Sequence, residues 1–389
     1  MRVAIDLTAL NANPSGIDRY LLGLVRSLAH LEKHADFFLF INVEDRARFS
    51  EKNRLPNHCR VWPICFRPRF VRLFFQQLLL PILLYLLRID VLHSPTFIMP
   101  LWRSRARHIL TIHDMSSFLL PQTHPAIRRG PVYERVVSAS IRRAEMITVP
   151  SESVKADILR IVTGARPERI RAIACGIEEA FHPRDAAEVQ PVLQQLGIST
   201  PYIFFLGTLE PRKNLPLLID AFAELVRQGR TERLVLGGAQ GWLPNELLSR
   251  LAPGVRDRIH LTGYIAETEL PFVYAGATLF VYPSLLEGFG FPPLEAMASG
   301  VPVIAANNSS LHENLAGAAM LVSSDNKEEM VGAMHWLLSD ERARAQARET
   351  GLRLVEAFRW ERFAEQTFAC YKEVSARALD GGAKINPRQ

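Results

Sequence analysis

The sequence predicts an α/β protein with two domains, each built on a doubly wound parallel sheet. Short apolar segments alternate with helical stretches along the whole chain, which is the pattern of such sheets. The chain has 389 residues, more than one core of ordinary size needs. A polar linker at 179–199 separates two series of these segments. We therefore predict domains at 1–180 and 181–359, a last helix at 360–379 and a flexible tail at 380–389.

The composition is that of an ordinary globular protein. Hydrophobic residues make up 48% and charged residues 22% of the chain, which argues against disordered and fibrous classes. Cys59, Cys65, Cys175 and Cys370 form no C-x-x-C pair and no metal-binding spacing. We therefore expect reduced thiols in a cytoplasmic protein. The first residues run directly into a strand-like pattern, and no secretory signal is visible.

Positive charge is concentrated in the first half of the chain. Residues 1–180 carry 26 Lys and Arg against 16 Asp and Glu, whereas the rest carries 20 against 24. The basic clusters contain Arg60, Arg67, Arg69, Arg72, Arg103, Arg105 and Arg107, and the interleaved aromatic residues are Trp62, Phe66, Phe70, Phe74 and Phe75. This pattern suits an anionic membrane surface, and a buried helix with a solvated basic flank is the alternative. The apolar run 78–87 is too short to span a bilayer, and no nucleic-acid-binding module accompanies the charge.

The first domain is expected to contain seven strands, at 3–7, 37–42, 61–65, 91–94, 107–114, 146–151 and 170–178. After the first strand, a helix should begin at Gly16 and continue to about Leu28. His113 and Asp114 close an apolar strand, where open α/β sheets place ligand-binding groups. A histidine that merely ends a strand is the alternative reading.

The second domain begins with an apolar strand at 202–207 that is followed by a basic turn. Arg212 offers a fork of hydrogen-bond donors and Lys213 a compact charge, and together they can neutralise a diphosphate without a metal ion. The chain has no Asp-x-Asp metal motif. A solvated basic turn is the alternative. Further strands are expected at 234–241 and 259–265.

The most informative stretch is 279–304, in which two apolar strands flank a glycine-rich turn and a short helix. Gly290, Pro292 and Pro293 suit the start of that helix, so Glu287 belongs to the loop and Glu295 to the helix. Free amides at a helix start suit a phosphate, and the two carboxylates suit sugar hydroxyl groups. The pattern therefore fits a nucleotide-sugar, with two solvated acids as the alternative.

The stretch 287–305, EGFGFPPLEAMASGVPVIA, resembles the signature of the retaining glycosyltransferases of family 4. Two further stretches are similar to that family, GIDRY at 16–20 and EPRKN at 210–214. Asp18 departs from the pattern, because relatives often have a second glycine there. The resemblance implies two Rossmann-like domains that face each other across a cleft, the GT-B architecture, with the last helix crossing back to the first domain.

The resemblance also implies roles for individual residues. Arg212 and Lys213 would contact the diphosphate, Glu295 the ribose and Glu287 the transferred sugar. Catalytic roles are expected for His113, Glu287, Arg212 and Lys213. Donor-binding roles are expected for Gly16, Gly207, Arg212, Lys213, Tyr264, Ile265, Glu287, Gly288, Phe289, Gly290 and Glu295. Arg19 and Asp114 are expected on the acceptor side.

The expected activity is transfer of a hexose with retention, without a metal ion or other cofactor. The residues of these motifs resemble those of the bacterial mannosyltransferase branch. This resemblance implies GDP-mannose as donor and a lipid-linked or oligosaccharide acceptor in surface polysaccharide synthesis. A UDP-sugar enzyme of the same fold and a non-catalytic nucleotide-sugar-binding subunit are the alternatives. A nicotinamide-dependent oxidoreductase is disfavoured, because the first strand is not followed by G-x-G-x-x-G. We expect a cytoplasmic protein, with possible contact with the inner face of the membrane.

Overall fold

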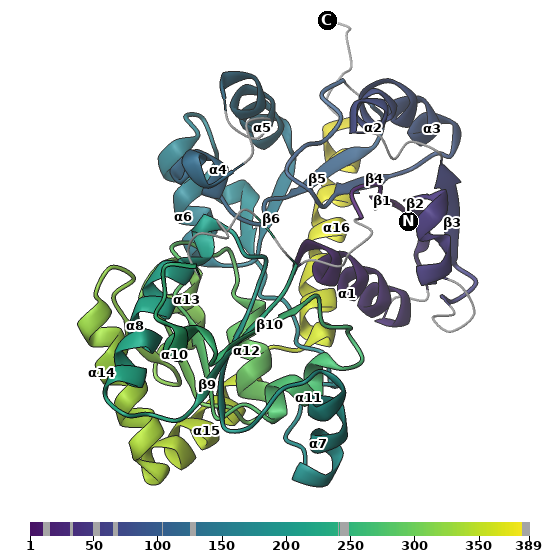
Figure 1. The fold of residues 1–389 in the computed structure, drawn as a ribbon. Helices are drawn as coiled ribbons and strands as arrows, with labels where there is room; N and C mark the ends of the chain where they lie inside the picture. The colour runs from purple at the N-terminus through teal and green to yellow at the C-terminus, as the bar shows by residue number, and fades with distance from the viewer. Residues whose placement is uncertain are drawn as a thin grey trace, which may run out of the picture. The chain divides into compact units, whose positions relative to one another are not determined.

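The computed structural model describes residues 1–10, 16–31, 34–49, 55–64, 69–102, 104–124, 130–239, 241 and 249–382. The chain divides into two compact units (Figure 1). Unit 1 comprises Met1–Gly176 and Arg359–Gln389, and unit 2 comprises Ile177–Phe358. Unit 1 is therefore built from two separate parts of the sequence.

Unit 1 contains a parallel sheet of seven strands in the order β3-β2-β1-β4-β5-β6-β7. The strands are β1 Arg2–Asp6, β2 Asp36–Asn42, β3 Cys59–Ile64, β4 Val91–Ser94, β5 Arg107–Thr111, β6 Met146–Val149 and β7 Ile170–Ala172. The main helices are α1 Gly16–Leu31, α2 Arg69–Phe74, the π-helix η3 Phe75–Leu79, α3 Leu80–Leu86, α4 Ser116–Leu119, α5 Pro131–Arg143, α6 Glu152–Ile161 and α16 Trp360–Gly382. Each of the seven predicted strands is present, and β4 has the predicted bounds.

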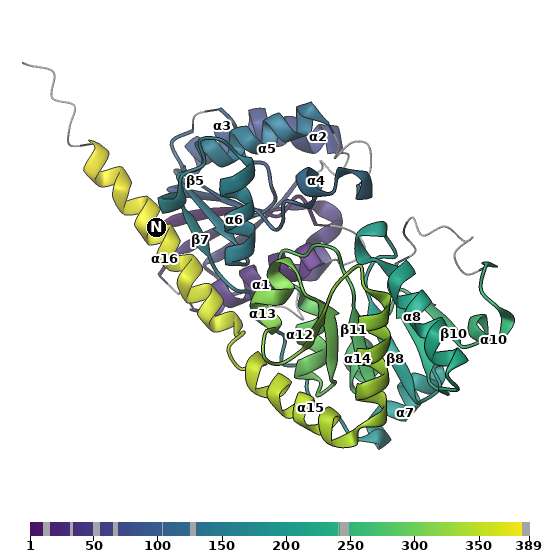
Figure 2. The same ribbon diagram turned by 90° about the vertical axis from the view of Figure 1, so that its left-hand side faces the viewer.

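Helices cover both faces of this sheet. On one face, Phe75, Leu80 and Leu84 pack against apolar strand residues such as Phe38 and Leu92. Farther along the sheet, α5 and α6 pack against β5 and β6. On the other face, α16 contacts α1 and the strands β4, β5 and β6 (Figure 2). The C-terminal part of unit 1 thus completes the cover of its own sheet.

Close approach between α16 and its neighbours depends on two glycines. A Cβ atom at Gly23 in α1 would lie 2.2 Å from the Trp360 ring, and one at Gly176 would lie 2.3 Å from the Trp360 backbone nitrogen. Helix α16 continues past its expected end at Leu379 to Gly382. The rest of the predicted tail, 383–389, lies outside the described residues.

Unit 2 contains a second parallel sheet, in the order β10-β9-β8-β11-β12-β13. Its strands are β8 Tyr202–Leu206, β9 Arg233–Gly237, β10 Ile259–Gly263, β11 Leu279–Tyr282, β12 Val303–Ala306 and β13 Met320–Val322. Its helices include α7 Ala186–Gln195, α8 Leu215–Arg227, α10 Pro253–Arg256, α11 Leu270–Ala275, α12 Phe291–Ala298, α13 Ser309–Leu315, α14 Lys327–Ser339 and α15 Glu341–Val355. Helix α8 packs on α14, whereas α12 packs on α11 and α15.

The prediction of a linker at 179–199 was wrong over much of its length. Asp185 caps helix α7, which begins at Ala186 and carries a capping box with Glu188. Val189 and Leu193 of α7 are buried, and they lie close to Gly276 at the end of α11. The polar residues that suggested a linker form the outer face of an amphipathic helix, and its few apolar residues attach it to unit 2.

Two further expectations are checked by the described residues. No helix among them is both long enough and apolar enough to cross a membrane. Cys59, Cys175 and Cys370 are unpaired thiols, as predicted, and Cys65 lies outside the described residues. Burial raises the pKa of the Cys59 thiol to about 12 and that of Cys370 to about 11.

Candidate functional site

The loop after β11 leads into α12 through a left-handed residue. Gly290 is the N-cap of α12 and has a φ of 92°, a conformation that favours glycine. A Cβ atom there would also lie 2.8 Å from Leu311. Pro292 and Pro293 occupy the first turn of the helix. Glu287 therefore lies in the loop at the carboxyl end of β11, and Glu295 lies within α12, as the sequence predicted.

Glu287 is buried and surrounded by donors. Its Oε1 atom accepts hydrogen bonds from Lys213 Nζ at 2.6 Å, from Ser284 Oγ at 2.5 Å and from the Tyr282 hydroxyl at 3.2 Å. Its Oε2 atom lies 3.1 Å from a guanidinium nitrogen of Arg212. The structure therefore brings together Glu287, Arg212 and Lys213, which we define as the β11 cluster.

The two cations of the β11 cluster are presented by a short 3-10 turn, Pro211–Lys213, that follows β8. Asn214 ends this turn with left-handed dihedral angles, φ 54° and ψ 41°. Its amide donates hydrogen bonds to the carbonyl oxygens of Pro283 and Ser324, at 3.2 and 2.7 Å. Asparagine is among the residues that tolerate this conformation best. Asn214 therefore fixes the turn against the loop that carries Glu287.

Arg212 is held at three points. It donates to the Glu210 carboxylate at 2.8 Å and to the Leu286 carbonyl oxygen at 2.7 Å, and it pairs with Glu287. Because the planar guanidinium group is fixed on several sides, it is held in one orientation. The Lys213 ammonium group also donates to the Tyr282 hydroxyl at 2.6 Å.

The charges of the β11 cluster keep Glu287 ionised. Burial by itself would raise the pKa of Glu287, but the charges of Arg212 and Lys213, with the hydrogen bonds from Lys213 and Ser284, hold it at about 2. Burial and the neighbouring Arg212 charge lower the pKa of Lys213, and the attraction of Glu287 opposes them. The two cations face the carboxylates of Glu287 and Glu210, so a negatively charged ligand would compete with these carboxylates for the donors of Arg212 and Lys213.

The first turn of α13 holds the backbone of Glu287. The backbone N–H of Glu287 donates to Ser309 Oγ at 3.1 Å, and Ser310 Oγ donates to the Glu287 carbonyl oxygen at 2.9 Å. Ser309 has a φ of 43°, a conformation that a non-glycine residue adopts only when its surroundings enforce it. Ser284 and Tyr282 were not identified from the sequence as site residues, because a serine or tyrosine near a strand end is an ordinary feature.

Glu295 lies in a separate buried position on α12. The Tyr274 hydroxyl of α11 donates to Glu295 Oε2 at 2.9 Å. Tyr274 is itself enclosed by the rings of Phe181, Phe204 and Phe280. An aromatic residue of the core thereby orients the carboxylate that was predicted to bind the ribose.

The other predicted donor-binding residues of unit 2 differ in exposure. Gly207 follows β8 and lies beside the aliphatic chain of Lys213. Tyr264 exposes about half of its side chain, 47%, whereas Ile265 is buried against Gly237. The Ile265 side chain thus belongs to the core, which leaves only its backbone for a ligand.

Gly288 and Phe289 lie in the loop between Glu287 and Gly290, and both are buried. The Phe289 ring packs on Phe291 and Phe358, at centroid distances of 4.8 and 5.7 Å. Its carbonyl oxygen accepts a hydrogen bond from Asn314 at 2.7 Å. The Phe289 side chain therefore anchors the loop, so any ligand contact there falls to the backbone.

His113 and Asp114 lie just beyond β5 in unit 1, at the carboxyl edge of that sheet. A ring nitrogen of His113, Nε2, lies 2.7 Å from the Pro95 carbonyl oxygen, and the ring packs edge-on against Tyr20 and Phe97. Burial lowers the pKa of His113, against the opposing effects of the Pro95 hydrogen bond and the Asp114 charge. Asp114 accepts a hydrogen bond from the Ser116 backbone N–H at 2.8 Å.

Gly16 and Arg19 lie in the first turn of α1 in unit 1. Gly16 is exposed and Arg19 is half-buried. The loop 11–15 that precedes them lies outside the described residues. The site residues predicted in the first half of the chain thus belong to unit 1, and the β11 cluster and Glu295 belong to unit 2.

Two family models match the chain. The model described as Glycosyltransferase Family 4 matches residues 14–181, and the model described as Glycosyl transferases group 1 matches residues 193–353. The chain is also similar to the O-antigen chain mannosyltransferase B of Escherichia coli, with 33% identity over 371 residues, 92% of this chain and 96% of that protein. The chain belongs to glycosyltransferase family 4. The predicted family and the glycosyltransferase class of enzyme are thereby confirmed.

Other relatives and solved structures agree with this assignment. The serotype-specific mannosyltransferase WbdA of E. coli is 28% identical over 229 residues, 57% of this chain and 28% of that protein. Sucrose-phosphate synthase from Thermosynechococcus elongatus has a TM-score of 0.77 at 22% identity, covering 97% of this chain and 99% of that one. WaaG, a glycosyltransferase of lipopolysaccharide biosynthesis, has a TM-score of 0.71 at 16% identity, covering 94% and 98%. These structures confirm the predicted GT-B fold class.

The glycosyltransferase also contains a buried polar network in unit 1 that the sequence did not reveal. His93 of β4 is hydrogen-bonded to Thr111 Oγ1 and to the Tyr371 hydroxyl of α16, both at 2.7 Å. Thr111 in turn contacts the hydroxyl groups of Tyr20 and Thr148. Burial, with a smaller contribution from His113, lowers the pKa of His93 to about 3. The network ties α16 to β5, the strand that precedes His113.

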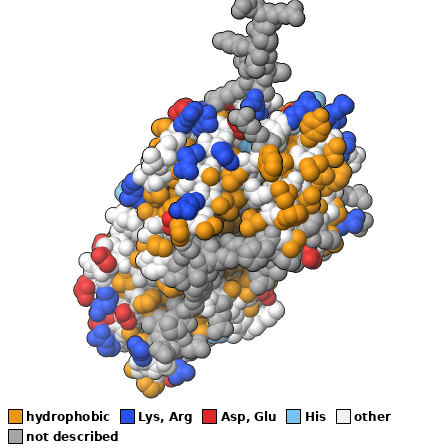
Figure 3. All heavy atoms as spheres, turned by 90° about the horizontal axis from the view of Figure 1, so that it is seen from above, with side chains coloured by type: hydrophobic (Ala, Val, Ile, Leu, Met, Phe, Trp, Pro, Cys, Tyr) orange, Lys and Arg blue, Asp and Glu red, His pale blue; other side chains and the backbone are white. Residues whose placement is uncertain are grey.

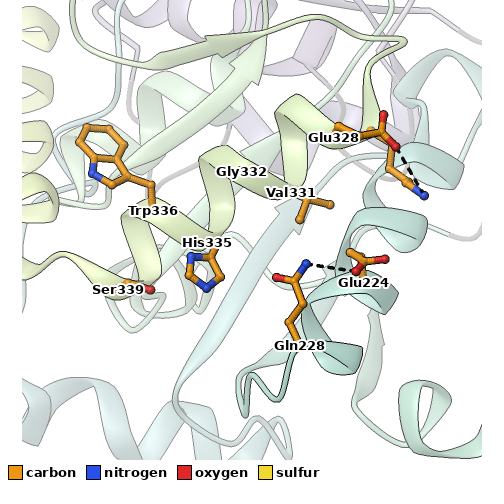
Figure 4. Close-up of a pocket in the computed structure, with 9 residues that line it drawn as sticks. Glu224, Gln228, Glu328, Val331, Gly332, His335, Trp336 and Ser339 are labelled. Carbon is orange, nitrogen blue, oxygen red and sulfur yellow. Dashed lines mark hydrogen bonds and ion pairs between the residues drawn. The ribbon is translucent and has the colours of Figure 1, made fainter.

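A pocket of about 690 Å³ lies between α8 and α14 of the glycosyltransferase (Figure 4). Its lining includes Glu224, Gln228, His335 and Trp336, and Gln228 donates a hydrogen bond to Glu224 at 3.1 Å. No residue predicted for the site lines this pocket. Within the described ranges, no three His, Cys, Asp or Glu side chains are grouped so that they could hold a metal ion.

Proposed function

We propose that this glycosyltransferase transfers mannose from GDP-mannose with retention of configuration and without a metal ion. The observation that carries the proposal is the β11 cluster, in which Arg212 and Lys213 converge on Glu287 at the carboxyl end of β11. The names of two relatives support the choice of sugar, since both are mannosyltransferases. Guanine is then the proposed base, because GDP-mannose is the mannose donor that the family resemblance implies.

The β11 cluster suits the departure of a nucleoside diphosphate. In the structure the carboxylates of Glu287 and Glu210 pair with Arg212, and Glu287 also pairs with Lys213. A bound diphosphate would share these two cations, and its charge grows as the glycosidic bond breaks. Fixed cations in a buried position stabilise such charge without having to reorganise. Two cations of the protein would thereby supply the charge that a metal ion supplies in other transferases.

The proposed reaction exchanges one bond at the anomeric carbon for another. The bond from this carbon to the diphosphate oxygen breaks through an oxocarbenium-like transition state. The acceptor hydroxyl attacks on the same face, and its proton passes to the departing diphosphate oxygen. Glu287 is proposed to accept hydrogen bonds from the hydroxyl groups of the sugar, and Glu295 to bind the ribose.

The acceptor is proposed to bind on unit 1, near Gly16, Arg19 and Asp114. His113 is proposed to lie beside the transferred sugar, where its lowered pKa favours the neutral ring. The relative named as an O-antigen chain mannosyltransferase suggests a lipid-linked or oligosaccharide acceptor for surface polysaccharide. A cytoplasmic location at the inner face of the membrane would suit such an acceptor.

A UDP-sugar donor is the second candidate. Anabaena HepE was solved in complex with UDP-glucose, and it has a TM-score of 0.73 to this chain at 18% identity, covering 98% of this chain and all of that one. The two donors differ in the base, which is proposed to contact the backbone around Tyr264 and Ile265.

A thermal-shift panel of GDP, UDP, ADP, CMP and NAD, with and without magnesium, separates these candidates. A ligand that binds the folded state raises the melting temperature. We expect a shift with GDP that does not require magnesium and is lost in Glu295→Ala. A shift with UDP alone would select the second donor, and a shift with NAD alone would contradict a nucleotide-sugar site.

Turnover needs its own test, because a nucleotide-sugar-binding subunit would give the same thermal shift. We expect the isolated protein to hydrolyse GDP-mannose slowly to free mannose, and to do so much more slowly after Lys213→Met. Proton NMR of the product formed with an acceptor reports the anomeric configuration. Binding without hydrolysis or transfer would support the non-catalytic alternative.

A further inference from the structure

The helical segment 69–86 of unit 1 is apolar on the side that faces away from the sheet. Seven of the fifteen large hydrophobic side chains that are exposed in the described residues lie here: Val71, Phe74, Leu78, Leu79, Ile82, Tyr85 and Leu86. Their spacing of three or four residues places most of them along one stripe of the helix. We define this stripe, with Trp102, as the α2–α3 face. In Figure 3 hydrophobic side chains gather on the side of the view where α2 and α3 lie, with Lys and Arg at their border.

The opposite side of the same segment is packed in the core. Phe75, Leu80 and Leu84 are buried against the sheet. Phe75, one of the aromatic residues of the basic segment, agrees with the buried-helix alternative, because it packs in the core. A helix that is apolar all round is normally covered on all sides, and here the described residues cover only one. The two readings of this segment, a core helix and a surface, therefore both apply.

Trp102 extends the α2–α3 face from a neighbouring loop. Gln77 of the π-helix η3 donates to the Met99 carbonyl oxygen at 3.0 Å and accepts from the Leu101 backbone N–H at 2.9 Å. Trp102 exposes 70% of its side chain, and a groove of about 400 Å³ runs between it and Leu78. The loop is thus fixed to the helix, so the exposed indole is held beside the apolar stripe.

The surroundings of the α2–α3 face are positively charged. Residues 55–110 contain eight arginines and a single acidic residue, Asp90. The Asp90 carboxylate accepts a hydrogen bond from the Arg2 backbone N–H. Arg60, Arg88 and Arg105 are exposed, and Arg143 donates to the Leu101 carbonyl oxygen next to Trp102. The described residues thus place cations around an apolar face, with exposed Tyr85 and Trp102 among them.

We propose that the α2–α3 face docks on a lipid bilayer with anionic headgroups. Apolar side chains would enter the acyl boundary, Tyr85 and Trp102 would lie at the headgroup level, and the arginines would pair with phosphates. A second copy of the chain is the competing occupant. It is disfavoured, because a two-fold interface would bring the arginines of both copies together. The docking is independent of the donor that the enzyme uses.

Flotation of the full-length protein with vesicles tests this docking. We expect binding to vesicles of phosphatidylcholine mixed equally with phosphatidylglycerol, little binding to phosphatidylcholine alone, and loss of binding in high salt. The variant Tyr85→Ser with Leu86→Ser should bind the mixed vesicles about tenfold more weakly, because two exposed apolar groups are lost. The variant Arg88→Gln with Arg105→Gln should bind about 25-fold more weakly, since each arginine near an anionic surface contributes about fivefold.

Matched variants on unit 2 control for nonspecific effects. Mixed vesicles should shift the tryptophan emission of the wild type to the blue, and this shift should be lost in Trp102→Phe but kept in Trp336→Phe, which alters an exposed tryptophan of α14. Arg353→Gln, on exposed α15, should bind vesicles as the wild type does. The thermal shift with GDP should be the same in all these variants, so a failure of docking is distinguishable from a failure of the proposed transfer.

Three results would overturn the proposal. One is equal binding to neutral and anionic vesicles. Another is binding that the substitutions on the α2–α3 face leave unchanged. The third is a concentration-dependent dimer in light scattering, lost in Tyr85→Ser with Leu86→Ser, without any vesicle binding; that result would assign the face to a second copy of the chain.

Discussion

Lys213 Nζ lies 2.6 Å from Glu287 Oε1, and both side chains are buried. Their residues are 74 positions apart, one in the turn after β8 and the other in the loop after β11. Because these two strands are neighbours in the sheet, the pair joins two loops at its carboxyl edge. Each partner offsets part of the cost of burying the other, together with Arg212, Ser284 and Tyr282.

We predict that Lys213→Met destabilises the protein, because it leaves the buried Glu287 carboxylate with Arg212 as its remaining cation. The free energy of unfolding in urea should fall by about 3 kcal/mol. Lys155→Met is the matched control, since Lys155 pairs with Glu152 near the surface, and it should change stability by less than about 1 kcal/mol. Equal small changes in the two variants would show that the buried pair contributes no more than a surface pair.

The low pKa of Glu287 predicts acid sensitivity. The carboxyl group has a pKa of about 2 in the folded protein and about 4.5 when exposed. The folded state therefore gains stability from the charged form at pH values above 4.5, and loses this contribution as the pH falls toward 2. The contribution is on the order of 3 kcal/mol.

Glu287→Gln removes this contribution. The melting temperature of this variant should be lower than that of the wild type at neutral pH. As the pH falls below 4.5, the melting temperature of the variant should decrease less steeply, down to the lowest pH at which the protein is folded. Differential scanning calorimetry across this range measures both slopes. Parallel curves for the two proteins would mean that Glu287 does not titrate in this window.

The low pKa of His93 predicts that the protein also loses stability in a second pH range, which lies above the range set by Glu287. The pKa of His93 is about 3 in the folded protein, against 6.5 when exposed. The unfolded chain then binds more protons than the folded chain below pH 6.5, so stability is lost as the pH falls from 6.5 toward 3. His93→Gln should reduce the slope of melting temperature against pH between 6.5 and 4.5, a range above the Glu287 window. An unchanged slope would contradict the prediction.

The contact of Tyr274 with Glu295 predicts a coupling between the core and nucleotide binding. Tyr274→Phe removes the hydrogen bond to Glu295, so we expect about 1 kcal/mol of lost stability and a smaller thermal shift with the nucleoside diphosphate. Tyr202→Phe is the matched control, because the buried Tyr202 hydroxyl donates to the Val273 carbonyl oxygen and not to a site residue. It should lose similar stability and keep the thermal shift. A reduced thermal shift in both variants would assign the effect to the core as a whole.

The packing of α1 against α16 predicts a strict requirement for glycine at position 23. In Gly23→Ala the new methyl group would overlap the Trp360 ring, and we expect about 2 kcal/mol of destabilisation from overpacking. Gly332→Ala is the control within α14, where the added Cβ meets no atom within 4 Å. This change should stabilise by about 0.5–1 kcal/mol, because alanine is the better helix former. Chemical denaturation measures both, and a tolerated Gly23→Ala would contradict the packing.

Local patterns determined much of the fold and part of the candidate site. Apolar runs between turn residues predicted β4 with its observed bounds and a strand at the start of 279–304, where β11 lies, because a strand buried on both faces needs a continuous apolar segment. Gly290 and the prolines after it predicted the start of α12, and hence the loop position of Glu287. Helix α7 and strand β13 were not predicted, since α7 has few apolar residues and β13 is three residues long.

The tertiary structure alone decided which side chains meet. His93 and Tyr371 are 278 residues apart, and no local pattern connects them. Phe74 is exposed whereas Phe75 is buried, because the helix turns one toward solvent and the other toward the sheet. The sequence by itself determined the strands, the turns and the types of side chain at their ends. The parallel sheet then placed the turn after β8 beside the loop after β11, and this proximity fixed the partners, burial and charge of Glu287.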